Sequence, residues 1–312
     1  MEPRVSETLP HPLTRSIMAV APMAISAPER GRDLEYRVAS PGRGEGLPVI
    51  LFSHDFRPSC YAYDVLADYW AAQGFAVIQP DHLDSWRCGL APDDPRAAEF
   101  WRHREDDMVR LLDRMDEIEQ AAPHIRGRID RSKIAVAGLS WGARTASMLL
   151  GATHPDPKDG RIVRLADGRV KAGVLLCIPG TGGDNLTPLA KDHFPFMNPD
   201  FSGMTMQSLV ICGDKDQSPL STRGPEWWRE AYDLAPGSEA LFTLFDAEHP
   251  LGGINTYESE QQSNASRSRV AAVQRVTTAF LSHALSDDGG AWNKERATAK
   301  AGGDADGRLE CK

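Results

Sequence analysis

The feature that most constrains the fold is a regular alternation of short apolar runs with longer segments whose apolar residues recur every three or four positions. The short runs are rich in β-branched residues, which is typical of buried strands, and the longer segments have the spacing of helices with one apolar face. Strands that alternate with helices usually pair in parallel, because each helix carries the chain back along the sheet. The alternation predicts an α/β fold with a mostly parallel central sheet and helices on both faces.

Apolar runs predict strands at residues 47–53, 75–79, 133–137, 170–178, 208–212 and 241–245. Apolar stripes predict a helix that ends at Gly74, a long helix from Trp101 to Ile118, a helix over residues 143–150, and a closing helix that carries Val270, Val273, Phe280 and Leu281. The 312 residues could form two domains, but α/β folds often exceed 200 residues as one unit. A single domain over residues 31–285 is therefore expected.

The two ends of the chain differ in composition from this domain. Residues 1–30 contain five prolines, which predicts an extended arm, because proline interrupts helices. Residues 286–312 are rich in Gly, Ala, Asp and Lys, with almost no bulky apolar side chains. Such a segment cannot offset the entropy lost on ordering, so we expect a disordered tail.

Composition and charge limit the class of protein and its partners. With 41% hydrophobic and 25% charged residues, the chain has the composition of an ordinary globular protein. A net charge of -9 without a dense run of Lys or Arg argues against nucleic acid or an anionic membrane as a partner. No apolar segment is long enough to span a membrane. These features predict a cytoplasmic protein, and they leave its oligomeric state open.

Metal and cofactor motifs are not apparent in the sequence. The cysteines are five, an odd number, and Cys177 and Cys212 lie in strand-like runs where cysteine acts as a small apolar residue. Their spacing fits neither a disulfide framework nor a zinc site. The glycine-rich stretch before Asp184 and Asn185 lacks the spacing of a calcium or phosphate loop. We therefore expect no metal and no cofactor.

The clearest chemical motif is Gly138-Leu139-Ser140-Trp141-Gly142, which stands between a predicted strand and a predicted helix. This setting is the one in which a G-x-S-x-G sequence presents a nucleophilic serine on a strained turn. The start of the helix also points free backbone N–H groups at any oxyanion formed beside Ser140, with Trp141 N–H as the first donor. Ser140 is therefore the candidate nucleophile.

A nucleophilic serine needs a base and an orienting acid. His249 follows the last predicted strand and a short turn, which places it at the same edge of the sheet as Ser140. Asp214 and Asp216 follow the strand at 208–212, and either could reach His249; Asp216 is favoured. The order Ser140, Asp216, His249 is the order of an α/β-hydrolase triad. Asp184 and Glu248 are weaker alternatives for the acid.

Taken together, these motifs resemble the α/β-hydrolases similar to dienelactone hydrolase and platelet-activating-factor acetylhydrolase, which include bacterial carboxylesterases. The resemblance covers roughly residues 25–285 and rests on five segments in matching order. They are Val49-Ile-Leu-Phe-Ser-His54, Gly74-Phe-Ala-Val-Ile-Gln-Pro-Asp-His82, Gly138-Leu-Ser-Trp-Gly142, Gly213-Asp-Lys-Asp216 and Ala247-Glu-His249.

The resemblance implies an α/β-hydrolase catalytic domain and a second oxyanion donor, the backbone N–H of Phe56. The chain departs from the family at Asp55, where a glycine is usual, so a carboxylate stands close to the expected oxyanion. Either Arg57 or His54 neutralises Asp55, or its side chain points into solvent. A serine in place of the cysteine of dienelactone hydrolases points to ester cleavage.

Residues of the loops at this edge of the sheet are candidates for a substrate pocket, or they are ordinary core. The candidate pocket residues are His54, Asp55, His82, Trp86, Phe194, Phe196, Met197 and Trp228. The sequence thus predicts a serine hydrolase that cleaves small-molecule carboxylic esters through an acyl-enzyme. The alternatives are an amide, thioester, lactone or polyester hydrolase with the same triad, or a catalytically impaired binding protein.

Overall fold

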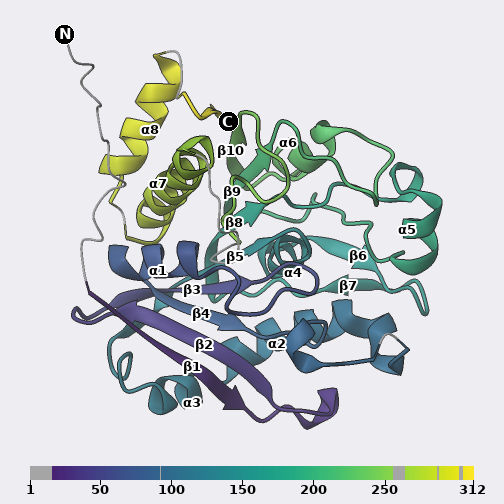
Figure 1. The fold of residues 1–312 in the computed structure, drawn as a ribbon, viewed down its shortest axis with the longest axis horizontal. Coiled ribbons are helices and arrows are strands. Elements are labelled where there is room, and N and C mark those ends of the chain that lie inside the picture. Colours follow the sequence, from purple (N-terminus) through teal and green to yellow (C-terminus); the bar gives the residue numbers. More distant parts are fainter. Residues whose placement is uncertain (1–15, 92, 256–263, 287, 302–304) are drawn as a thin grey trace.

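The computed structural model describes residues 16–91, 93–255, 264–286, 288–301 and 305–312 (Figure 1). Within these residues a nine-stranded sheet forms the centre of the molecule. In spatial order its strands are β1 (Ile17–Ile25), β2 (Leu34–Pro41), β4 (Ala76–Pro80), β3 (Leu47–Ser53), β5 (Ile129–Leu139), β8 (Val170–Leu176), β9 (Gln207–Gly213), β10 (Ser238–Leu244) and β11 (Gly307–Cys311). β6 (Thr153–Pro155) and β7 (Ile162–Arg164) pair separately as a short hairpin.

The middle of the sheet is parallel, as the sequence predicts. β4, β3, β5, β8, β9 and β10 run in one direction, whereas β1, β2 and β11 join the edges by antiparallel pairing. Each predicted strand overlaps one of the six parallel strands. The structure is therefore a mixed α/β one with a mostly parallel central sheet, and the sequence prediction lacks the antiparallel edge strands.

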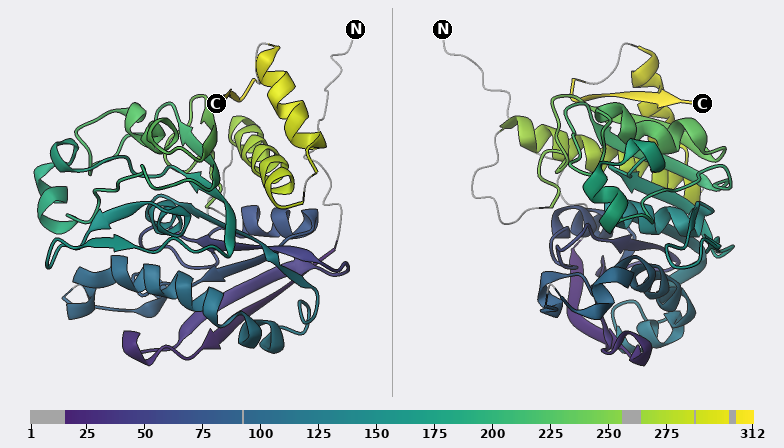
Figure 2. Two further views of the ribbon diagram at one scale, coloured as in Figure 1. Left: turned by 180° about the vertical axis from the view of Figure 1, so that it is seen from behind. Right: turned by 90° about the vertical axis from the view of Figure 1, so that its right-hand side faces the viewer.

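Helices cover both faces of the sheet (Figures 1 and 2). They are α1 (Asp64–Gln73), α2 (Phe100–Asp113), α3 (Met115–Ala121), α4 (Trp141–Leu150), α5 (Pro188–His193), α6 (Glu230–Leu234), α7 (Asn264–Ser286) and α8 (Gly290–Lys300). α1 packs against α7, and α2 packs against α4. Crossovers between parallel strands are right-handed as a rule, so α1, which leads from β3 back to β4, and α4, which leads from β5 on to β8, belong on opposite faces. Among the described helices, none combines the length and the apolar character needed to cross a bilayer.

The predicted helix from Trp101 to Ile118 is in fact two helices. Arg114 separates α2 from α3 with φ -105° and ψ 20°, outside the helical region. Its guanidinium binds the carboxylate of Glu117 in the next turn. The apolar stripe continues across the break, so the spacing of apolar residues cannot detect it.

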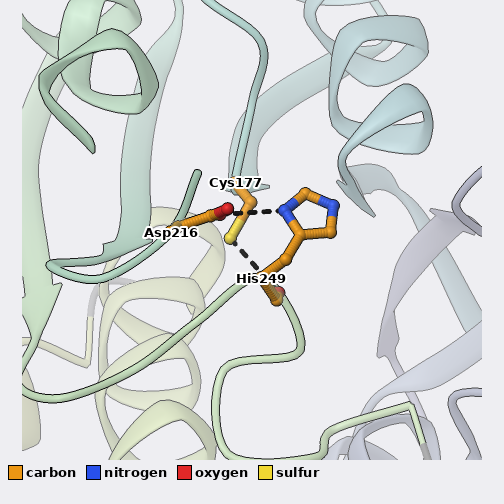
Figure 3. Close-up of side chains that lie close together, drawn as sticks. All are labelled: Cys177, Asp216 and His249. Atoms are coloured by element: carbon orange, nitrogen blue, oxygen red, sulfur yellow. Dashed lines mark hydrogen bonds and ion pairs between the residues drawn. The ribbon is translucent and has the colours of Figure 1, made fainter. Parts of the chain in front are cut away.

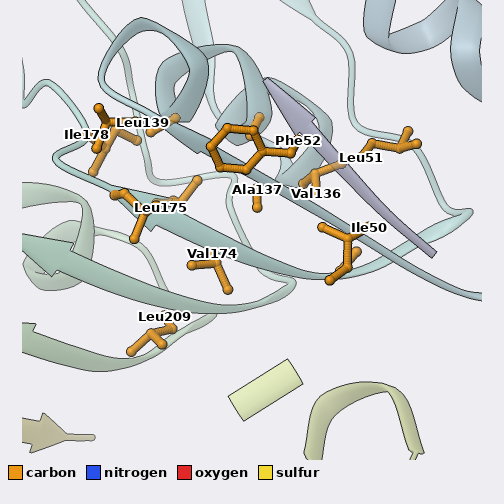
Figure 4. Packing of buried hydrophobic residues seen from close by; sticks show 14 of the residues in the cluster. Ile50, Leu51, Phe52, Val136, Ala137, Leu139, Val174, Leu175, Ile178 and Leu209 are labelled. Atoms are coloured by element: carbon orange, nitrogen blue, oxygen red, sulfur yellow. The ribbon is translucent and has the colours of Figure 1, made fainter. Parts of the chain in front are cut away.

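The core lies between the sheet and the helices of both faces. Because the central strands are covered on both sides, both sets of alternating side chains are apolar, which explains their continuous apolar sequences. Figure 4 shows part of this packing from β3, β5, β8 and β9 and the segment that follows β8. The labelled residues are Ile50, Leu51, Phe52, Val136, Ala137, Leu139, Val174, Leu175, Ile178 and Leu209.

The C-terminal segment corrects the expectation of a disordered tail. Residues 286–312 contain α8, which packs on α7, and β11, which pairs with β10 (Figure 2). Trp292 of α8 is fully buried, with its ring centre 5.5 Å from that of Phe280 and its Nε1 donating to Glu239 Oε1 at 2.9 Å. Average composition hides the effect of this single large side chain. At the other end, β1 is extended as expected, and residues 1–15 lie outside the described residues.

Substitution of Trp292 by alanine tests whether the tail belongs to the folded domain. We expect Trp292→Ala to lower the free energy of unfolding by about 3–5 kcal/mol, because it leaves a large buried cavity. Urea denaturation monitored by circular dichroism measures this change. The matched control is Trp86→Ala, because Trp86 is 61% exposed and its loss should cost at most about 0.5 kcal/mol. Equal, small effects of both substitutions would show that the tail does not pack as described.

Candidate active site

Ser140 lies at the sharp turn between β5 and α4. Its backbone has φ 55° and ψ -114°, a conformation that costs a non-glycine residue about 1–3 kcal/mol. The turn is possible because the flanking residues are glycines. A Cβ on Gly142 would overlap the backbone oxygen of Ser53 in β3, and one on Gly138 would overlap the backbone of Gly142. This context supports the interpretation of G-x-S-x-G as a strained nucleophile turn.

The backbone of Ser140 is held on both sides. Its N–H donates to Leu176 O at 2.8 Å, and its carbonyl accepts from Arg144 N at 2.9 Å. The residue is 6% exposed. Since Ser140 follows the central strand β5, its side chain stands at the carboxyl edge of the parallel sheet, where loops from several strands meet.

His249 and Asp216 form a close pair at the same edge. Asp216 follows β9 and His249 follows β10, and the two strands are neighbours in the sheet. His249 Nδ1 lies 2.8 Å from Asp216 Oδ2, while its second ring nitrogen points away from that carboxylate (Figure 3). Trp228 supports both residues, because its ring centre is 4.9 Å from that of His249 and its Nε1 donates to Asp216 O at 3.2 Å.

Of the four acids considered from the sequence, the structure brings Asp216 to His249. Asp216 is fully buried beside the imidazole. Asp184 instead contacts Lys191 at the surface, and Glu248 is exposed. Asp214 belongs to the same loop as Asp216, but its only described hydrogen bond runs from its backbone N–H to Leu244 O.

The Asp55 side chain lies where the sequence predicts the oxyanion. Its Oδ1 accepts from Phe56 N–H at 2.6 Å and from Trp141 N–H at 3.4 Å, and these are the two predicted oxyanion donors. Its Oδ2 is 3.7 Å from His249 Nε2, and the Ser140 hydroxyl lies near enough to help lower the pKa of the same carboxylate. Asp55 therefore contacts both predicted donors and faces the predicted base, beside the predicted nucleophile.

This position decides among the alternatives left open for Asp55. The carboxylate points inward, with a side chain 20% exposed, rather than into solvent. His54 contacts the backbone oxygen of Asp55, with Nδ1 at 2.6 Å, and not its carboxylate. Arg57 contributes its backbone N–H to Asp84 at 3.1 Å. The basic side chain that faces the Asp55 carboxylate is His249, which the sequence did not suggest.

The electrostatic surroundings favour a charged Asp55 and a charged His249. Burial alone would raise the pKa of Asp55, but His249, the Phe56 N–H and the Ser140 hydroxyl together hold it below its usual value. Burial alone would lower the pKa of His249, but its hydrogen bond to Asp216 and the nearby Asp55 carboxylate raise it far above 6.5. These surroundings favour the imidazolium form of His249, which cannot accept the Ser140 proton.

Arg104 of α2 is a supporting residue that the sequence analysis missed. Its guanidinium is 1% exposed and binds both carboxylate oxygens of Asp84, at 2.9 and 2.7 Å. It also donates to the carbonyl oxygens of His54 and Asp55, each at 2.7 Å. These contacts fix the backbone that carries the Phe56 N–H. A signal was present in the sequence, because Arg104 lies on the apolar stripe of Trp101 and Met108, at helical spacing.

Removal of the Arg104 guanidinium leaves the buried Asp84 carboxylate without its partner. We expect Arg104→Met to lower the free energy of unfolding by about 3–5 kcal/mol, measured by urea denaturation. The control is Arg102→Met, because Arg102 is a surface residue and its ion pairs are worth about 1 kcal/mol at most. Adding Asp84→Asn to Arg104→Met should recover part of the loss. A loss no greater than that of Arg102→Met would contradict the role given to Arg104.

The aromatic residues predicted to line a pocket differ in how close they lie to Ser140. The ring of Phe194 meets those of Trp141 and Phe56, with ring centres 5.2 and 6.4 Å apart, so it lies beside the oxyanion donors. Phe196 packs against Trp141 at 5.3 Å but is itself buried. The Trp86 side chain is exposed, and the backbone N–H of this residue donates to the backbone oxygen of Arg57 at 2.8 Å. A pocket at these rings stays a prediction.

Three of the predicted pocket residues are core residues in this conformation. His54, His82 and Met197 are at most 1% exposed. The ring of His82 lies 2.9 Å from both Ser53 Oγ and Asp107 Oδ2, so its two nitrogens already have partners. Side chains without exposed surface cannot contact a substrate here. Their polarity reflects a buried hydrogen-bond network beneath the loop of Asp55, which sequence spacing alone does not distinguish from a pocket.

Cys177, Asp216 and His249 are the group of side chains whose spacing comes closest to a metal site within the described part of the chain. Their ligand atoms lie within 4.8 Å of one another (Figure 3). Ligand atoms in a tetrahedral zinc site lie about 3.4 Å or more apart, but the Asp216–His249 contact at 2.8 Å has the length of a hydrogen bond. Burial raises the pKa of the Cys177 thiol, which donates to His249 O at 3.5 Å. The geometry therefore fits an acid–base pair better than a metal centre.

The site combines a hydroxyl on a strained turn, an imidazole–carboxylate pair, and two convergent backbone N–H groups. These are the parts that acyl transfer requires: a nucleophile, a proton carrier and a site for negative charge. Asp55 adds a carboxylate at the centre of this arrangement. No model of a known protein family matches the chain, so its function has to be inferred from the site.

Proposed function

We propose that the protein is a serine hydrolase of the α/β-hydrolase fold that cleaves carboxylic esters through an acyl-enzyme. The observation that carries this proposal is that the strained turn of Ser140 and the His249–Asp216 pair lie on two sides of the same carboxylate, that of Asp55, at the carboxyl edge of the sheet. The mostly parallel sheet with crossover helices on both faces supports the choice of fold.

The proposed reaction begins when His249 is neutral. Its Nε2 accepts the proton of Ser140 Oγ as this oxygen attacks the carbonyl carbon of the ester. The N–H groups of Phe56 and Trp141 bind the oxyanion that forms. The bond to the alcohol oxygen then breaks, and His249 returns its proton to that oxygen. Asp216 keeps the imidazole in the tautomer and orientation that this transfer needs.

Water completes the cycle by the same steps. His249 takes a proton from a water molecule, which attacks the acyl carbon, and the bond to Ser140 Oγ breaks as the oxygen is protonated again. The products are an acid and an alcohol. Amides, thioesters, lactones and polyesters pass through the same kind of tetrahedral intermediate, and among these classes we propose esters because serine replaces the cysteine of the resembling dienelactone hydrolases.

A panel of para-nitrophenyl esters from acetate to decanoate, with a matched anilide and thioester of butyrate, tests the proposed class. We expect ester turnover, and we expect His249→Gln to abolish it. Glu248→Gln is the control, because Glu248 is the exposed neighbour of His249 in the same loop. Absence of turnover of every ester, or turnover that persists in His249→Gln, would count against the proposal.

One observation favours a second function, a hydrolase-like binding protein without turnover. The Asp55 carboxylate fills the site proposed for the oxyanion, and it favours the protonated form of His249. Under this second hypothesis, neither the natural protein nor Asp55→Ala hydrolyses any ester of the panel. Under the first hypothesis, turnover occurs, and its rate changes when Asp55 is replaced by alanine.

A further inference from the structure

We propose that the Asp55 side chain is a displaceable occupant of the oxyanion site. The carbonyl oxygen of a substrate binds Phe56 N–H and Trp141 N–H only after the Asp55 carboxylate has rotated away. The carboxylate of the acid product must also displace Asp55 from these N–H groups, so the product binds weakly. This inference rests on the proposed function, because it assumes that the two N–H groups serve Ser140.

The first support is the match between Asp55 and the species that it would exclude. Its Oδ1 is one negatively charged oxygen bonded by two backbone N–H groups, as an oxyanion of a tetrahedral intermediate would be. Its Oδ2 faces His249 Nε2 at 3.7 Å, on the side where a product acid would contact the base. The carboxylate thus mimics the acid product within the protein's own chain.

The second support is that the backbone is fixed while the side chain is not enclosed. Arg104 holds the carbonyls of His54 and Asp55, and Asp84 holds the N–H of Arg57. The Asp55 N–H also donates to the Tyr63 hydroxyl at 3.4 Å. Rotation about the Cα–Cβ bond of Asp55 therefore frees the oxyanion site without moving the Phe56 N–H. The side chain is one-fifth exposed, which gives it a path to solvent.

A permanent role for Asp55 as a neutral acid that donates to the oxyanion does not fit this site. Such a role needs a carboxyl group kept protonated by apolar surroundings. Here two N–H donors and an imidazolium face the carboxylate, and each of them favours its charged form. A charged Asp55 that stayed in place would repel the oxyanion. An enzyme with aspartate at position 55 can therefore bind the oxyanion only if the Asp55 side chain is displaced.

Displacement of the Asp55 side chain also lowers the pKa of His249, the proposed base. The groups that face His249 are the carboxylates of Asp216 and Asp55, the thiol of Cys177 and the ring of Trp228. When Asp55 leaves, His249 keeps one carboxylate partner instead of two, and its pKa falls. The imidazole can then lose its proton and accept that of Ser140. When the substrate carbonyl replaces the Asp55 carboxylate, it would thus gain the two N–H donors and leave His249 able to act as a base.

The test compares the natural protein with Asp55→Ala and Asp55→Asn, using para-nitrophenyl butyrate as substrate and butyrate as the product acid. Loss of one oxyanion donor costs enzymes about 10²–10³-fold in kcat, so freeing this site should raise kcat/KM at least about tenfold. Butyrate should bind at least about tenfold more tightly to Asp55→Ala, measured by calorimetry without turnover. In Asp55→Asn, the rise of kcat/KM with pH should move to lower pH, because His249 has lost a charged partner.

Glu248→Gln is the matched control, because it removes an exposed acid next to His249 and should change none of these values. A lower kcat/KM in both Asp55 variants, or unchanged butyrate affinity in them, would overturn the inference. Circular dichroism checks that each variant is folded, and Asp55→Asn, which keeps the shape of the side chain, serves if Asp55→Ala does not fold. Tighter butyrate binding without ester turnover in any variant would instead support the inference about Asp55 and defeat the proposed function.

Discussion

Replacing Ser140 by alanine is expected to lower kcat for para-nitrophenyl butyrate by about 10⁴–10⁶-fold, the range seen when a hydrolase loses its nucleophile. The reason is that no acyl-enzyme can form, and the remaining turnover comes only from binding and from the oxyanion donors. Steady-state kinetics of the purified protein measures this loss. The substitution removes one oxygen from a residue that is 6% exposed, so the fold should survive it.

The control for this experiment is Ser132→Ala, which makes the same change on the strand that leads to Ser140. Ser132 is an exposed residue near the start of β5, at the opposite end from Ser140. Its loss should leave kcat unchanged. If Ser140→Ala retained activity within about tenfold of the natural protein, another residue would have to be the nucleophile, because loss of a nucleophile costs far more.

Asp216→Asn should have the second largest effect, a loss of about 10⁴-fold in kcat with little change in stability. Asparagine has the size of aspartate but no negative charge. Its amide can also hold the His249 ring in the wrong tautomer, so that Nε2 carries a proton and cannot act as a base. The same steady-state assay measures the effect, and urea denaturation shows whether the buried site tolerates the change.

Asp214→Asn is the matched control, because Asp214 lies two residues away in the same loop. The sequence alone leaves the choice between these two acids open, and the structure pairs Asp216 with His249. We expect Asp214→Asn to change kcat less than about tenfold, since no described contact joins it to the imidazole. A loss of the expected size in Asp214→Asn but not in Asp216→Asn would show that the loop adopts another arrangement in the working enzyme.

The central strands could be predicted because burial on both faces gives them continuous apolar sequences. The edge strands lack this property. Residues of β1 such as Met18 and Val20 are exposed, and β2 carries a buried Arg37 that forms ion pairs with Asp64 and Asp68 of α1. A charge that is paired by a distant helix interrupts the apolar run in the sequence. Antiparallel edges and the order of the strands therefore needed the structure.

The candidate site shows the same division between local and distant causes. Ser140 and His249 could be selected as candidates from the sequence because each stands in a short motif just after a strand. The direction of the Asp55 side chain could not, since it depends on N–H groups from two different segments and on a histidine nearly 200 residues away. Arg104 was missed for a related reason, because its role is defined by Asp84 and by the backbone that it holds.

The most direct test of the central claim is to treat the protein with a fluorophosphonate probe and to locate the adduct by mass spectrometry of its peptides. Such a probe reacts with a serine that is activated as a nucleophile. Adduct on Ser140, absent from Ser140→Ala, is the result we predict. Ester turnover by a protein that carries no adduct on Ser140, or adduct on a different residue together with loss of activity, would contradict the proposal that Ser140 is the nucleophile.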